Sequence, residues 1–151
     1  MLHQLRDVFA SFQKHEVKYM IIGGIAAIPY GVPQATFDLH ILIEATINNA
    51  QKLLDALIDA KFGIASMTSA QGLVKTEITI FEDRVRIDVQ TSTPGIDFER
   101  AWRNCQVMGY HGRELYVVLK EDLVASKRAA GRKVDLEDVR LLEIDNWNQQ
   151  L

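Results

Sequence analysis

Two side chains able to act together, Asp38 and His40, interrupt an otherwise apolar run in the segment FDLHILIE. Side chains two positions apart on a strand point to the same face of a sheet. A strand over residues 38–43 would therefore raise this carboxylate and this imidazole side by side, while the alternate apolar residues project from the opposite face. The pair predicts a functional site on this strand.

A glycine pair precedes that strand. Gly23 and Gly24 follow the apolar residues 18–22 and open a short helix, which Gly31 and Pro33 end. The free N–H groups and positive dipole end of a helix N-terminus can bind phosphate groups. Strand, glycine turn, short helix, loop and acidic strand together form a coherent pattern for a nucleotide site, although many tight strand-to-helix turns also use a glycine pair.

A second acidic strand is expected in a hairpin formed by residues 75–81 and 84–90. If the alternate apolar residues of the second strand face the core, Asp88 and Arg86 point away from it. With a two-residue loop centred on Glu82 and Asp83, Glu77 would lie directly opposite Asp88. Like charges so placed destabilise a strand pair unless a cation or a proton neutralises them. Arg86 is one such cation, and a divalent metal is the other.

Carboxylates gathered in this way suit metal-assisted phosphoryl transfer. Mg²⁺ binds oxygen ligands, typically one or two carboxylates together with the phosphates of the substrate. Two ions about 4 Å apart can stabilise both the attacking and the leaving oxygen of such a reaction. Asp38 and Asp88 are the predicted carboxylates.

The segment IIGGIAAIPYGVPQATFDLHILIE resembles the nucleotidyltransferase superfamily with the DNA polymerase β fold. It looks most like the small bacterial branch of minimal nucleotidyltransferases and abortive-infection toxin enzymes. Asp88 in VRIDVQ matches the third aspartate of that pattern, and LKEDLVASKRAAGRKVDLEDVRLLE looks like the family's C-terminal stretch. The resemblance covers most of the chain. The residues of the first segment that match the pattern are Gly23, Gly24, Gly31, Thr36 and Asp38.

This resemblance implies a metal-dependent nucleotidyltransferase, in which an acceptor hydroxyl attacks the α-phosphorus of a nucleoside triphosphate and pyrophosphate leaves. The implied acceptor is a small molecule, an RNA or a protein. The resemblance implies Asp38 and Asp88 as catalytic residues, with Asp88 helping to activate the hydroxyl. It also implies a divalent metal, Mg²⁺ in the family, at Asp38, His40 and Asp88. The implied nucleotide-binding residues are Gly23, Gly24, Thr36 and Lys127.

The chain departs from the family at His40, which stands where the pattern has its second aspartate. Imidazole suits Mn²⁺ or Zn²⁺ better than Mg²⁺. Three interpretations follow. The site has lost transfer activity and the chain is a binding or regulatory protein, for example in a toxin–antitoxin pair or in phage defence. Alternatively, the site uses a softer metal, or Glu77 supplies the missing carboxylate.

The patterns along the whole chain predict an α+β (mixed α/β) domain, a nucleotidyltransferase-like mixed sheet flanked by helices. Residues 62–73 are read as a loop or a short edge strand, and Asp135 as the N-cap of the last helix. Ile58 is expected to point inward, and Thr76, Ile78 and Ile80 to form one apolar face. Helices are expected over residues 2–15, 47–60, 97–104, 120–130 and 135–146, and a second hairpin over 106–108 and 114–118.

Composition bounds the possibilities further. The chain has 151 residues with 48% hydrophobic content, which predicts a single domain over 1–151 with C-terminal helices at about 119–147 packed against it. A net charge of −3 gives no global attraction to nucleic acid or to a membrane surface. The single Cys105 excludes an internal disulfide and favours the cytoplasm. The small size leaves room for a homodimer or a partner protein at the acceptor site.

Overall fold

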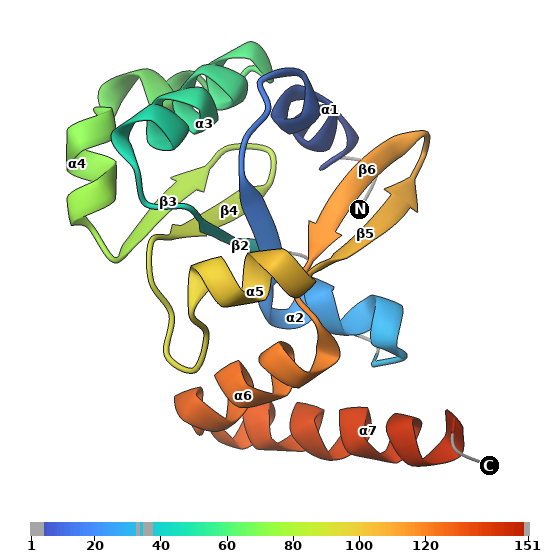
Figure 1. The fold of residues 1–151 in the computed structure, drawn as a ribbon. Helices are drawn as coiled ribbons and strands as arrows, with labels where there is room; N and C mark the ends of the chain where they lie inside the picture. Colours follow the sequence, from blue (N-terminus) through green and yellow to red (C-terminus); the bar gives the residue numbers. More distant parts are fainter. Residues whose placement is uncertain (1–4, 33, 35–37, 150–151) are drawn as a thin grey trace.

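The computed structural model describes residues 5–32, 34 and 38–149, with side chains up to residue 144. Within these residues the strands form one six-stranded sheet in the order β3-β4-β2-β1-β6-β5 (Figure 1). The strands are β1 (Tyr19–Ile22), β2 (Leu39–Ile43), β3 (Ile78–Glu82), β4 (Arg86–Gln90), β5 (Gln106–Tyr110) and β6 (Arg113–Val117). The helices are α1 (Arg6–Lys14), α2 (Gly23–Ala27), η2 (Ile28–Tyr30), α3 (Ile47–Asp59), η3 (Gly63–Met67), α4 (Ala70–Lys75), α5 (Phe98–Asn104), α6 (Lys120–Ala130) and α7 (Lys133–Gln149).

The sheet is mixed, because the central strands combine both kinds of pairing. β1 runs antiparallel to β2 and parallel to β6, and β2 runs parallel to β4. Antiparallel hairpins, β3–β4 and β5–β6, form the two edges. Helices α1, α3 and α4 lie on one side of this sheet, and α2, α6 and α7 on the other (Figure 1). The α+β prediction, with a mixed sheet flanked by helices, is therefore confirmed.

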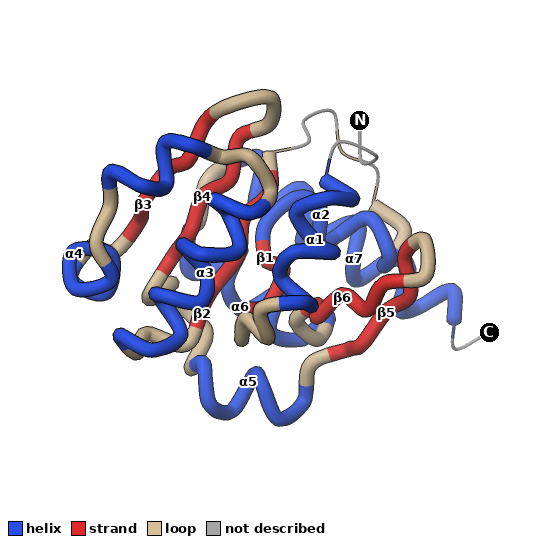
Figure 2. The backbone as a smooth tube through the Cα atoms, turned by 90° about the horizontal axis from the view of Figure 1, so that it is seen from above, coloured by secondary structure: helices blue, strands red, loops and turns tan. Residues whose placement is uncertain are grey.

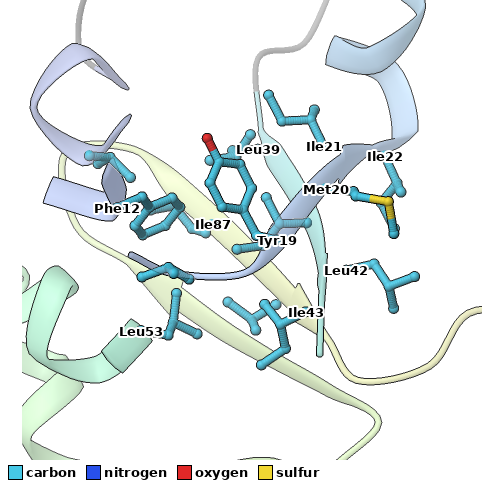
Figure 3. Packing of buried hydrophobic residues seen from close by; sticks show 14 of the residues in the cluster. Phe12, Tyr19, Met20, Ile21, Ile22, Leu39, Leu42, Ile43, Leu53 and Ile87 are labelled. Atoms are coloured by element: carbon cyan, nitrogen blue, oxygen red, sulfur yellow. The ribbon is translucent and has the colours of Figure 1, made fainter. Parts of the chain in front are cut away.

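The core fills both faces of the central strands. Seen from above, α3 lies across β2 and β4, and α1 lies beside it (Figure 2). Phe12 of α1 packs on Tyr19 with their ring centroids 4.9 Å apart. Met20 and Leu42 point to the other side of the strands and are also buried (Figure 3). Because β1 and β2 are covered on both faces, they read as nearly continuous apolar runs, and the partly exposed His40 is the exception within β2.

A buried asparagine fixes the relative position of β1 and β2. The side-chain amide of Asn49, at the start of α3, donates to the carbonyls of Lys18 and Glu44, both at 2.9 Å. Its oxygen accepts the backbone N–H of Lys18 at 2.9 Å. The Asn49 side chain thus joins the beginning of one strand to the end of the other, and these two strands carry the glycine turn and His40.

The β3–β4 hairpin has a different register from the one predicted. Three residues, 83–85, connect the strands, so Ile80 lies opposite Asp88 and the carbonyl of Glu77 accepts the N–H of Thr91. The prediction that Glu77 opposes Asp88 is wrong, because it assumed a two-residue loop.

The same register change reverses the faces of β3. Phe81 is buried, whereas Ile78 and Ile80 are each 47% exposed. A shift by an odd number of positions moves every side chain of a strand to the other face. The predicted apolar face of Thr76, Ile78 and Ile80 is therefore wrong, while Ile87 and Val89 of β4 are buried as expected.

Other elements largely follow the predicted pattern. The second hairpin turns at His111 and Gly112, whose φ angles of 49° and 77° suit a two-residue hairpin turn. Residues 62–73 are neither a loop nor an edge strand: they contribute to η3 and α4, with Ser69 capping α4 by accepting the N–H of Gly72. Ile58 is exposed and not inward. No helix among the described residues is long and apolar enough to cross a membrane.

Candidate functional site

A cleft of about 410 Å³ lies between the sheet and the C-terminal helices, next to the glycine turn. It brings together residues from the junction of β1 and α2, from β2 and β4, and from α6 and α7. A larger hollow of about 580 Å³ is found elsewhere, around Lys18 and Trp102, and none of the predicted site residues that the structure describes line it. The cleft residues that matter for its chemistry are Gly23, Gly24, Gln34, Asp38, His40, Arg86, Thr93, Ser126, Lys127, Arg132, Asp135 and Asp138.

The predicted pair, Asp38 and His40, lines this cleft together. Asp38 immediately precedes β2 and His40 is its second residue. The flanking Leu39 and Ile41 are fully buried, as the alternation of a strand requires. Among the described residues, the Asp38 carboxylate has neither a hydrogen bond nor an ion pair with another side chain.

The glycine turn passes very close to His40. Gly23 has a φ of 73°, and a Cβ built there would lie 3.1 Å from the Cβ of His40. A Cβ on Gly24 would lie 2.8 Å from the side-chain oxygen of Gln34. A side chain at Gly23 would therefore meet both backbone strain and the imidazole. Glycine is therefore required at position 23, whereas at position 24 the close contact is with the flexible end of the Gln34 side chain.

Asp88 reaches the same place from β4. The parallel pairing of β2 with β4 sets Asp88 beside His40, with His40 Nε2 3.7 Å from Asp88 Oδ2. The guanidinium of Arg86 donates two hydrogen bonds to this carboxylate, Nε to Oδ1 at 2.8 Å and Nη2 to Oδ2 at 3.3 Å. The Asp88 side chain is only 8% exposed. Arg86, one of the two neutralisers considered for Asp88, is thus hydrogen-bonded to both of its oxygens.

Burial and neighbouring charges set the protonation states of His40 and Arg86. Burial lowers the pKa of His40 below its ordinary value, and the carboxylates of Asp88 and Asp38 oppose this shift. The hydrogen bond with Asp88 raises the pKa of Arg86. Near neutral pH the cleft therefore holds a neutral imidazole beside a charged guanidinium.

The C-terminal helices add two more ion pairs to the cleft wall. Lys127 Nζ of α6 donates to Asp138 Oδ2 of α7 at 2.9 Å, and both side chains are largely buried. Arg132 donates two hydrogen bonds to the Asp135 carboxylate, Nε to Oδ2 at 2.7 Å and Nη2 to Oδ1 at 3.2 Å. Helix α7 begins at Lys133, so Asp135 lies in its first turn and the predicted N-cap role is wrong.

Most predicted site residues therefore meet in one cleft. Gly23, Gly24, Asp38, His40 and Lys127 line it, and Asp88 adjoins it through His40 and Arg86. Thr36 lies outside the described residues. The pairing of Lys127 with Asp138 was not anticipated. A buried lysine on one helix requires an anion, and Asp135 and Asp138, three positions apart, share a face of the next helix.

The residues present do not fit the divalent-metal site at Asp38, His40 and Asp88 that the family resemblance implies. Among the described residues, no group of three or more His, Cys, Asp or Glu side chains is placed to hold a metal ion. Both oxygens of Asp88 are engaged by Arg86, and the residue opposite Asp88 is Ile80 instead of Glu77. The third interpretation of His40, in which Glu77 replaces the missing carboxylate, is not supported by this register.

Comparison with models of known protein families and with curated protein sequences finds no match to this chain. The cleft gathers two guanidinium groups, a buried lysine, an imidazole and a carboxylate, Asp38, that has no partner among the described residues, all around the glycine turn.

Proposed function

We propose that this chain binds a phosphorylated ligand of the nucleoside triphosphate class in the cleft, as a binding or regulatory protein without metal-dependent nucleotidyl transfer. The observation that carries this proposal is the presence of two guanidinium groups, Arg86 and Arg132, in the lining of one cleft. Arg86 and Arg132 each donate two hydrogen bonds, to Asp88 and Asp135 respectively. A guanidinium has five N–H donors, so donors remain for the oxygens of a phosphate.

Several other features of the cleft agree with such a ligand. Its volume of about 410 Å³ falls within the usual range for small-molecule sites. Gly23 and Gly24 line the cleft without adding side chains to it, and Ser126 and Thr93 bring hydroxyl groups. Arg132 is 74% exposed, so a ligand can reach it without displacing the fold.

The absence of transfer is proposed because Asp88, the expected catalytic carboxylate, is held by Arg86. A carboxylate with both oxygens hydrogen-bonded to a guanidinium is a poor base and a poor metal ligand. The alternative of an active nucleotidyltransferase, implied by the family resemblance, stays a prediction, and the experiment below separates the two.

Calorimetric titration with ATP, GTP, CTP and UTP, in EDTA and in Mg²⁺, tests the proposal. We expect at least one nucleotide to bind and Arg132→Gln to weaken that binding by roughly tenfold, as for loss of a charge-assisted hydrogen bond. Arg140→Gln is the matched control. Like Arg132, Arg140 pairs with a carboxylate three positions away, that of Glu137, but this pair lies on the exposed surface of α7.

Two results would contradict the proposal. One is that none of the four nucleotides binds under either condition. The other is release of pyrophosphate by the wild-type protein in Mg²⁺ or Mn²⁺ with an acceptor present, which would restore the transferase interpretation.

A further inference from the structure

We infer that Arg86 is the built-in cation of the cleft: its guanidinium neutralises Asp88 in the place of a divalent metal and keeps such a metal out. This inference concerns the binding of metal alone and does not depend on whether a nucleotide binds. Arg86 holds the carboxylate that a metal ion in this cleft would need.

The first argument is the geometry of the Arg86–Asp88 contact. The two side chains project from the same face of β4, two residues apart. The fork places Nε 2.8 Å from Oδ1 and Nη2 3.3 Å from Oδ2, so both oxygens of Asp88 are engaged. A metal ion on this carboxylate would have to break these charge-assisted hydrogen bonds.

The second argument is burial. The Asp88 side chain is 8% exposed, whereas that of Arg86 is 39% exposed. A buried carboxylate requires a cation, since an uncompensated charge in the interior is strongly unfavourable. His40, the other neighbour of Asp88, lies farther away, with Nε2 3.7 Å from Oδ2. Among the described residues, Arg86 is the cation that hydrogen-bonds Asp88.

The third argument is what remains if the guanidinium is removed. Asp88 would keep His40 Nε2 at 3.7 Å from its Oδ2, and Asp38 lines the same cleft without a partner among the described residues. Among the described residues these three groups are not placed to hold a metal ion as they stand. Two carboxylates and one imidazole are nevertheless ligand types that Mn²⁺ or Zn²⁺ takes, and loss of the Arg86 guanidinium would leave them free to turn toward one ion.

The test titrates MnCl₂ and ZnCl₂ alone, without nucleotide, into wild type, Arg86→Ala and Arg86→Ala/Asp88→Asn. Calorimetry and thermal unfolding are the measurements. We expect no specific binding to wild type. Arg86→Ala should bind one ion, which raises its melting temperature, and the double variant should lose that binding. Arg140→Ala is the matched control, because it frees Glu137 from an equivalent fork on the surface and should bind no better than wild type.

Arg86→Gln serves as a second variant if Arg86→Ala does not fold. Its amide can still donate to Asp88, but it carries no charge, so it should also bind metal more tightly than wild type. The inference is overturned if wild type binds one Mn²⁺ or Zn²⁺ and Asp88→Asn abolishes that binding. It is equally overturned if a folded variant without the Arg86 charge binds no better than wild type.

Discussion

At the scale of single residues, Asp38 is the side chain whose role most depends on the ligand. The other carboxylates of the cleft each face a cation: Asp88 faces Arg86, Asp135 faces Arg132 and Asp138 faces Lys127. Asp38 has no such partner among the described residues. It will therefore repel the phosphates of a free nucleotide, or it will bind a metal ion that arrives with the nucleotide.

Asp38→Asn distinguishes these two roles. If Asp38 only repels, the substitution should tighten nucleotide binding in EDTA by roughly tenfold, the scale expected for removing one nearby like charge. Calorimetric titration with and without Mg²⁺ is the measurement, and Asp55→Asn on the exposed face of α3 is the control. Weaker binding confined to the Mg²⁺ titration would instead show that Asp38 holds the metal, and would favour the transferase interpretation.

At the scale of elements, the turn from β1 into α2 controls the position of His40. Gly23 combines a left-handed φ of 73° with a Cβ position only 3.1 Å from the Cβ of His40. Neither constraint can be relieved by moving the end of a flexible side chain, because one is a backbone dihedral angle and the other is a contact with the Cβ of His40, next to the backbone.

Gly23→Ala is expected to lower the free energy of unfolding by about 1–2 kcal/mol from backbone strain alone, with a further cost from the contact. It should also shift the NMR signals of the His40 ring. Urea denaturation measures the first effect. Gly109→Ala is the control, because its Cβ would meet nothing within 4 Å and the residue lies in β5. Equal stability of the two variants would contradict the close approach.

At the scale of the whole molecule, the C-terminal helices form one wall of the cleft. Helix α6 packs against α2 and α7 packs against α6. The buried pair of Lys127 and Asp138 joins the two C-terminal helices at 2.9 Å. Because both charges are removed from water, the loss of either partner leaves an uncompensated charge in the interior.

Lys127→Ala should therefore destabilise the protein by roughly 3–5 kcal/mol, whereas the double variant Lys127→Met/Asp138→Leu should recover much of that loss. Thermal and urea unfolding are the measurements. Arg128→Ala is the control: it lies next in the chain, pairs with Glu143 on the exposed surface, and should cost at most about 1 kcal/mol. A Lys127→Ala protein as stable as Arg128→Ala would show that the buried pair does not hold the two helices together.

Much of the fold was accessible from local sequence pattern. The apolar runs of β1 and β2, the amphipathic spacing of α3 and the turn at Gly23-Gly24 each depend on neighbouring residues, and each was predicted within a few positions. The sharing of one cleft by Asp38 and His40 also followed, because the two-residue period of a strand fixes which side chains share a face.

What the sequence determined by itself was thus the α+β class, the glycine turn and the polar pair, Asp38 and His40, at the start of β2. The tertiary structure decided how those groups are used. A three-residue loop between β3 and β4 set Ile80 and not Glu77 opposite Asp88, and parallel pairing with β2 brought Asp88 to His40. Loop length and partner choice depend on packing between segments far apart in the chain. For the same reason, only the folded chain shows that Arg86 hydrogen-bonds Asp88 and that Lys127 pairs with Asp138.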